Sequence, residues 1–204
     1  MAFEKLLKDN QAFIFELDDV LYPKKDYLLQ VYYLFAQFME YTEQLSATEI
    51  LTFMQSAYFK EGEADLFLKT ATHFNLPLKY QYNFDLLHEN ARLPLKLLLF
   101  APVLDFMKQI VSEGRRIFLL ADGNPVQQLN KIKQLEWNGL EAHLVVYFTE
   151  EISEKGSREA IEIIADKHTL PLGEIVMVTQ QEEGTGTTFP EGINLLTVDK
   201  LLCS

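Results

Sequence analysis

The sequence predicts an α/β protein in which an all-helical segment is inserted into a core built on a parallel sheet. From about residue 100 onward, short apolar runs typical of buried strands alternate with helical segments, which is the pattern of βαβ units. Residues 22–99 instead show helical periodicity and no convincing strand. We therefore expect residues 1–21 and 100–204 to form the α/β core and residues 22–99 to form a helical cap.

The first strand is expected to begin at Ala12, after a short leading helix, and to lie at the centre of the sheet. It is a short apolar run with aromatic and β-branched residues, and it ends in three carboxylates, Glu16, Asp18 and Asp19. Unpaired carboxylates resist burial, and parallel sheets bind ligands at the carboxyl ends of their strands. These three acids therefore mark a candidate functional site, and the alternative is that Asp18 and Asp19 only cap the turn.

Apolar residues recur with helical spacing in three parts of the cap segment. The first part runs from Tyr27 to Met39, the second from Ile50 to Tyr58 and the third from Leu66 to Phe74. Gly62 and Pro77 punctuate the segment, as residues between helices commonly do. We expect the whole segment to be helical.

Aromatic residues are concentrated in the cap, where eight of the nine tyrosines lie. Their rings fit the apolar faces of the helices, so we expect most of them to form the core of the cap. The alternative is that some rings stack on a base or pack against a partner. Tyr32 and Tyr33 are adjacent and cannot face the same core, so one of them should be exposed or at an interface.

The rest of the core is expected to alternate helices with strands. Pro102 fits the first residue of a helix, and the apolar run that ends at Ala121 fits a buried strand. The helices are expected at 102–112, 126–136 and 157–168, and the strands at 116–121, 142–148, 174–179 and 193–198. The stretch 180–192, with three glycines and one proline, is the only irregular one.

Composition excludes several classes of function. The 204 residues are 48% hydrophobic and carry a net charge of -12, which argues against sequence-independent binding to nucleic acid or to anionic membranes. The single cysteine, Cys203, cannot form an internal disulfide. The sequence shows no signal peptide and no apolar run of the roughly 18 residues that a membrane span needs. We expect a cytoplasmic protein that contacts neither nucleic acid nor a membrane.

Residues 13–23 resemble the first motif of the haloacid dehalogenase-like (HAD) phosphohydrolases, usually written Asp-x-Asp-x-Thr/Val. The resemblance covers nearly the whole chain, is most specific at 13–23 and 120–131, and follows the nucleotidase-like branch. It implies a HAD-like Rossmannoid parallel sheet with a cap between the first and second motifs. It also implies that Glu16 stands at the nucleophile position and Asp18 at that of the proton shuttle. Glu16 replaces the family's Asp, and a misplacement of about 1 Å can cost on the order of 100-fold in rate.

The second and third motifs imply a phosphate site. The family's phosphate-binding hydroxyl falls at Ala121, which has none. The residues that follow, Asp122, Gly123 and Asn124, resemble the nucleotidase-like continuation, and their backbone with the helix N-terminus could hold an anion; a simple helix cap is the alternative. Lys155 is the best candidate for the lysine that neutralises phosphate, and a solvated surface lysine is the alternative.

The fourth motif implies a metal site formed by Glu16, Asp18 and Gln180. Gln180 stands where the family has an Asp that holds Mg²⁺. Magnesium prefers anionic oxygen ligands, so a neutral amide is a poor substitute. Glu182 and Glu183 follow closely and could reach toward the site.

The sequence thus favours a HAD-fold protein with lost or strongly weakened phosphatase activity. Such a protein would serve as a binding or regulatory module and could hold a small phosphorylated or anionic ligand near Asp18, Gly123 and Lys155. No cofactor is expected in that case, and the partner protein is not identified. The alternative is an active Mg²⁺-dependent phosphomonoesterase of the nucleotidase-like branch with Glu16 as nucleophile. A third alternative is an interaction protein with an exposed aromatic patch on its cap.

Overall fold

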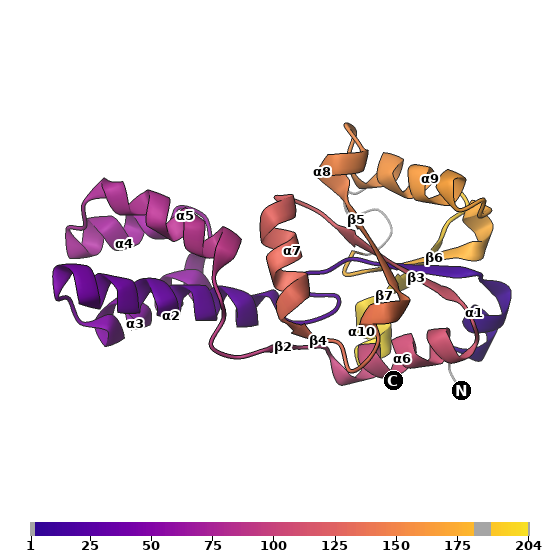
Figure 1. Ribbon diagram of the computed structural model, residues 1–204, viewed down its shortest axis with the longest axis horizontal. Helices are drawn as coiled ribbons and strands as arrows, with labels where there is room; N and C mark the ends of the chain where they lie inside the picture. Colours follow the sequence, from indigo (N-terminus) through magenta and orange to yellow (C-terminus); the bar gives the residue numbers. More distant parts are fainter. Residues whose placement is uncertain (1–2, 182–188, 204) are drawn as a thin grey trace.

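A five-stranded parallel sheet forms the centre of the core in the computed structural model, which describes residues 3–181 and 189–203 (Figure 1). The strand order is β5-β3-β1-β6-β7. The strands are β1 (Ala12–Phe15), β3 (Arg116–Ala121), β5 (Leu144–Phe148), β6 (Ile175–Thr179) and β7 (Asn194–Thr197). The predicted α/β class and the central position of the first strand are confirmed.

Helices cover both faces of this sheet (Figure 1). Helices α6 (Ala101–Ser112) and α10 (Val198–Leu202) lie on one face, and α9 (Ser157–Lys167) lies on the other. The short helices α1 (Glu4–Asp9) and α8 (Thr149–Ile152) complete the core. Side chains of β1 alternate between two hydrophobic clusters, as the period of a strand requires: Phe13 and Phe15 join the larger cluster and Ile14 the smaller.

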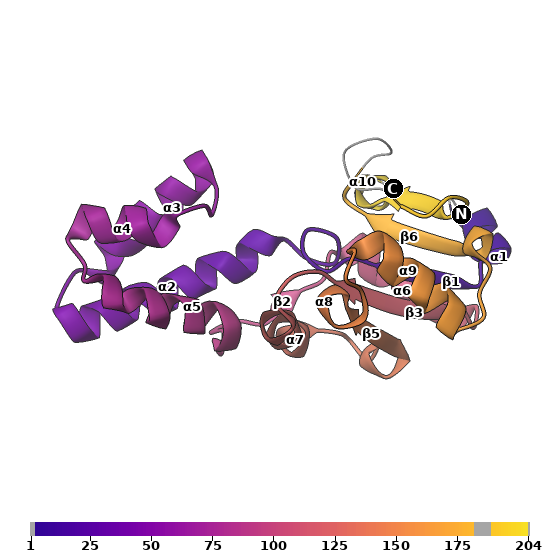
Figure 2. The same ribbon diagram turned by 90° about the horizontal axis from the view of Figure 1, so that it is seen from above.

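Four helices make up the cap, which stands apart from the sheet in both views (Figures 1 and 2). They are α2 (Lys24–Glu43), α3 (Ala47–Glu61), α4 (Leu66–Phe74) and α5 (Gln81–Asn90), with the 3₁₀ turn η1 (Leu78–Tyr80) before α5. Aromatic rings form much of its interior; those of Phe35 and Phe84, for example, meet edge to face at 5.1 Å. Tyr32 is buried and Tyr33 is 41% exposed, which confirms that only one of the pair faces the core.

A second, two-stranded parallel sheet was not predicted from the sequence. Strand β2 (Leu97–Leu98) leaves the cap and pairs with β4 (Leu135–Glu136), which follows α7 (Pro125–Gln134). The expectation that residues 22–99 hold no strand is therefore wrong at 97–98, and the helix predicted over 126–136 ends two residues early. The strand predicted at 142–148 also starts two residues late, at Leu144, because 141–143 form the 3₁₀ turn η2. A third 3₁₀ turn, η3 (Leu172–Glu174), precedes β6.

Helix α7 is the core helix that contacts the cap through hydrogen bonds. In both views it lies between the cap and the sheet (Figures 1 and 2). The amides of Asn130 and Gln134 both donate hydrogen bonds to the main-chain carbonyl of Ala91, each at 2.9 Å. The Asn124 amide donates to Glu89 of α5 at 3.2 Å. None of the helices within the described ranges combines the length and the apolar character that crossing a bilayer demands.

Candidate functional site

A cavity of about 510 Å³ opens where the cap meets the carboxyl ends of the core strands. The core and the cap both contribute to its wall. Its core residues include Glu16 and Asp18 after β1, Asp122 and Gly123 after β3, and Gln180 after β6. Lys24, Leu28 and Glu63 line it from the cap. Five of the sequence-derived site residues therefore share one cavity, because the carboxyl ends of parallel strands meet at one edge of the sheet.

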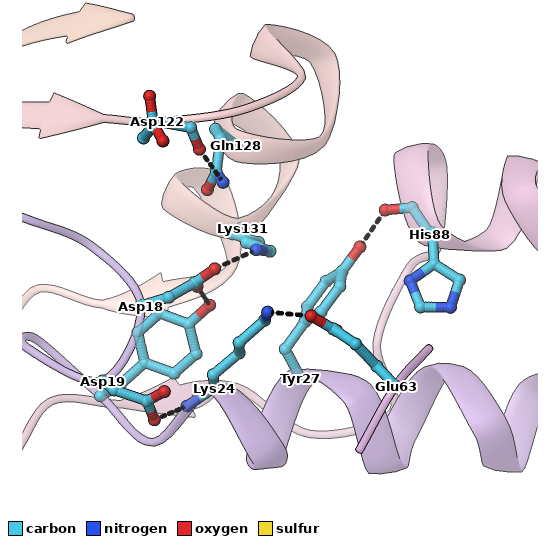
Figure 3. A network of polar contacts seen from close by, with 10 residues as sticks. Asp18, Asp19, Lys24, Tyr27, Glu63, His88, Asp122, Gln128 and Lys131 are labelled. Atoms are coloured by element: carbon cyan, nitrogen blue, oxygen red, sulfur yellow. Dashed lines mark hydrogen bonds and ion pairs between the residues drawn. The ribbon is translucent and has the colours of Figure 1, made fainter. Parts of the chain in front are cut away.

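Both carboxylate oxygens of Asp18 are engaged by neighbours (Figure 3). The Tyr22 hydroxyl donates a hydrogen bond to Oδ1 at 2.6 Å. The Lys131 ammonium donates to Oδ2, also at 2.6 Å. The turn that allows this has Asp19 in the left-handed region, with φ of 59°, and it returns the chain so that the Asp19 N–H donates to the Tyr22 carbonyl at 2.9 Å. Asp18 is thus held as an ion pair.

Lys131 is the residue of the candidate site that sequence reasoning missed. Its side chain is only 2% exposed, and its ammonium lies 5.0 Å from the centre of the Tyr27 ring. Burial lowers its pKa, while the charge of Asp18 acts in the opposite direction. The signal in the sequence was its place at the end of the stretch 120–131, where the resemblance is specific; in the structure, Lys131 and Gln128 are the buried residues of α7.

Glu16 lies half-buried at the end of β1. Its Oε2 accepts a hydrogen bond from the Thr179 hydroxyl at 2.8 Å, a contact that the sequence did not reveal. Burial raises the pKa of Glu16; hydrogen bonds from Thr179 and from the main chain of Gln180 oppose that rise, and the negative charge of Asp122 adds to it. The carboxylate at the nucleophile position is thus fixed by β6 and faces another acid.

The expected phosphate-binding residues are only partly at the cavity. Asp122 and Gly123 line it, whereas Ala121 is fully buried and neither Ala121 nor Asn124 is among the lining residues. Gly123 has φ of +90°, a conformation that favours glycine. Asn124 caps α7, because its Oδ1 accepts hydrogen bonds from two first-turn N–H groups at 2.9 and 3.2 Å. These two N–H groups are therefore not available to bind a phosphate.

The structure does not bring Lys155 into the cavity. Its side chain is 81% exposed and pairs with Glu159 at 3.3 Å, one turn along α9. The main-chain N–H of Lys155 donates to Ser153 and to Glu159, both at 3.1 Å, which fixes the turn before the helix. The expectation that Lys155 lies in the cleft therefore needs correction, because the helix that follows it supplies the acid with which it pairs. The buried cation beside Asp18 is Lys131 instead.

The residues at the implied metal positions do not fit Mg²⁺. Both oxygens of Asp18 are occupied by Lys131 and Tyr22, and Gln180 offers a neutral, exposed amide. Within 3–181 and 189–203, no group of three or more His, Cys, Asp or Glu side chains could hold a metal ion. Glu182 and Glu183, which the sequence suggested as further ligands, lie outside the described residues.

The cavity wall carries more negative than positive side chains. Its described lining contains five carboxylates and two lysines, Lys24 and Lys131. Lys24 pairs with Glu63 at 2.5 Å, and Lys131 pairs with Asp18 (Figure 3). Both lysine charges are therefore already matched by acids of the same wall.

His88 lies inside the cap, next to this network. The Tyr27 hydroxyl donates to its main-chain carbonyl (Figure 3). Its imidazole packs against the rings of Tyr32 and Phe84, with centroids at 6.1 and 4.6 Å, and Nε2 has no hydrogen-bond partner in the described part of the chain. Burial lowers the pKa of His88 to about 4, so the ring is neutral at neutral pH.

Comparison with known proteins identifies the fold. No protein-family model matches the sequence, and no curated protein matches it. Solved structures do: a HAD family hydrolase from Deinococcus radiodurans R1, solved with bound phosphate and sodium, shares 16% identity at a TM-score of 0.56, over 93% of this chain and 80% of that one. The L-2-haloacid dehalogenase RSc1362 shares 14% identity at a TM-score of 0.52, over 95% of this chain and 97% of that one.

These likenesses show which fold the chain has. Its fold is that of the HAD-like hydrolases, with a parallel sheet and a cap, as the resemblance of residues 13–23 implied. At these identities the likeness extends to the fold alone, since one fold can carry many functions.

Proposed function

We propose that this protein is a HAD-fold protein that has lost most or all phosphatase activity and acts as a binding module. The observation that carries the proposal is the ion pair of Asp18 with Lys131, reinforced by the Tyr22 hydroxyl. A proton shuttle must change its protonation state during the reaction and reach the leaving oxygen. The Lys131 ammonium at 2.6 Å and the Tyr22 hydroxyl occupy both oxygens of Asp18 and hold its carboxylate away from a leaving oxygen.

Three further residues support this proposal. Glu16 has one methylene more than the family's nucleophile and is held by Thr179. Ala121 lacks the phosphate-binding hydroxyl, and Gln180 lacks a charge for a metal. Groups that act as a unit in catalysis fail as a unit, so these departures do not add as small, separate losses.

An anionic ligand near Asp18 and Gly123 would meet an unfavourable charge balance. Phosphate needs cations or N–H groups to offset its charge. Lys24 and Lys131 would have to leave Glu63 and Asp18 before they could serve it. A small phosphorylated ligand therefore remains a second proposal, which requires that one ion pair exchanges partners.

The first prediction is that the purified protein does not hydrolyse phosphomonoesters. We expect no release of inorganic phosphate above the buffer blank from a panel of phosphate esters with Mg²⁺. The control is Glu16→Ala, which removes the carboxylate at the nucleophile position and so separates any residual activity from a contaminant. Turnover above about 1 s⁻¹, the lower end of ordinary enzymes, that disappears in Glu16→Ala would instead establish a phosphomonoesterase with Glu16 as nucleophile.

The second prediction is that Glu16→Asp alone does not restore turnover. The shorter side chain returns the family's nucleophile, but Asp18 stays paired with Lys131 and Gln180 still offers no charge to a metal. We expect phosphate release to stay within about tenfold of the unaltered protein in the same assay, which is less than the 10²–10³ that one preorganised group commonly contributes. A gain of 10²-fold or more would show that the extra methylene was the main defect.

A further inference from the structure

Three carboxylates of the cavity wall form no ion pair within the described part of the chain. Glu16 is bonded to a hydroxyl and a main-chain N–H, and Asp19 accepts the main-chain N–H of Lys24 at 2.8 Å. The Asp122 carboxylate makes neither a hydrogen bond nor an ion pair with the described residues. Acids gathered around an empty volume repel one another, and the charge of Asp122 indeed contributes to the raised pKa of Glu16.

Two amide oxygens of the same wall also lack partners. Gln128 is 6% exposed; its Nε2 donates to the Asp122 carbonyl at 2.6 Å, which leaves Oε1 buried and without a hydrogen-bond partner among the described residues. The Gln181 Oε1 is likewise buried and unpaired there. Buried polar atoms are almost always satisfied, so these acceptors would take a hydrogen bond from water or from a bound donor.

Three leucines add an apolar part to a wall that is otherwise mostly polar. Leu17, Leu28 and Leu120 line the cavity and are themselves almost fully buried. Such surfaces suit a hydrocarbon chain, and about 510 Å³ lies within the usual range of small-molecule pockets. The wall therefore offers uncompensated carboxylates, acceptor oxygens and apolar contacts, but no spare cation among its described residues.

We propose that this cavity binds a small organic cation with several N–H groups, of the class of aliphatic di- and polyamines. Its ammonium groups would donate to Glu16 and Asp122 and to the amide oxygen of Gln128, and its methylene chain would lie on the leucines. Each such contact is a charge-assisted hydrogen bond or satisfies a buried acceptor. This inference rests on the proposed function as a binding module and names its ligand class.

The test is a set of calorimetric titrations at constant ionic strength. The probes are 1,4-diaminobutane and spermidine, with MgCl₂ and inorganic phosphate as separate arms. The variants are Asp122→Asn and Glu16→Gln, each of which removes one carboxylate from the cavity. The matched control is Glu113→Gln, which removes the same charge from an exposed site at the end of α6. Thermal unfolding of each variant checks that the fold is retained.

We expect both amines to bind the unaltered protein with one site. Asp122→Asn and Glu16→Gln should each weaken this binding by about tenfold or more, because a hydrogen bond to a charged group is lost. Glu113→Gln should leave it within about twofold, because charges beyond a Debye length of about 8 Å are screened.

Three results would overturn the inference. They are the absence of amine heat at millimolar concentration, equal weakening in Glu113→Gln and Asp122→Asn, and tighter binding of phosphate or Mg²⁺ than of either amine. The titration and the phosphatase assay test different claims. Hydrolysis of phosphate esters would reject the proposed loss of activity, whereas only the titration decides whether the cavity binds amines.

Discussion

Replacement of Lys131 by methionine is expected to lower the free energy of unfolding by about 3–5 kcal/mol, the range measured when one partner of a buried ion pair is removed. The variant keeps most of the volume of the side chain but leaves the Asp18 carboxylate with Tyr22 as its only partner among the described residues. Lys131 is 2% exposed and Asp18 22%, so water reaches the carboxylate from the cavity side alone and replaces the lost ammonium only in part. Urea unfolding at pH 7 measures the effect.

Two further variants separate the ion pair from the loss of a lysine. Lys108→Met removes an exposed lysine on α6 and should change the free energy of unfolding by no more than about 0.5 kcal/mol. The double variant Asp18→Asn with Lys131→Met should recover a large part of the loss, because it removes both charges together. Two results would contradict this prediction. One is an equal free energy of unfolding in Lys131→Met and Lys108→Met, and the other is a double variant no more stable than Lys131→Met.

Acidification is expected to destabilise the protein by about 3 kcal/mol through His88 alone, following its pKa of about 4 in the folded state and 6.5 in the unfolded state. Between these two values the unfolded chain binds a proton that the folded chain does not. Stability is therefore complete above pH 6.5 and is lost as the pH falls toward about 4. The neutral ring packs against Tyr32 and Phe84, and a charged one would be buried without a partner for Nε2.

Unfolding curves recorded from pH 7 to pH 4 measure this effect. His88→Phe keeps an aromatic ring in place and should remove the contribution of His88 to the slope of stability against pH. His73→Phe is the control, since His73 stacks on Phe53 at the exposed side of the cap and its replacement should leave the slope unchanged. A slope that is the same in His88→Phe and in the unaltered protein contradicts the assignment.

The arrangement of helices and strands was largely predictable because it follows from periodicity. The apolar run that ends at Phe15 and the one that ends at Ala121 have the length of buried strands, and the structure pairs them in parallel. Strands β2 and β4 were not predicted, because a strand of two residues is too short to show a periodic pattern of apolar residues. Leu97 and Leu135 pair only because the chain that leaves the cap runs beside the end of α7, and that is a tertiary effect.

The candidate site was predictable only where the topology decides it. Glu16, Asp122 and Gln180 share a cavity because each follows a strand of one parallel sheet. The two lysines show the limit of this reasoning. Lys155 follows a strand too, but an acid on the next helix, α9, pairs with it at the surface. Lys131 lies within a helix, where a charged residue is normally exposed, and pairs with an acid more than a hundred residues away.

The pairing of Asp18 with Lys131 constrains how this chain can evolve. Under the proposed function, a gain of hydrolysis would require Asp18 to be released. Losing Lys131 first leaves an unpaired acid, and losing Asp18 first leaves an unpaired ammonium over the Tyr27 ring. Either intermediate gives up a large share of the 5–15 kcal/mol or so that keeps a typical domain folded, and selection removes such intermediates before a second substitution can arise. Descendants of this chain should therefore keep both residues or exchange them together.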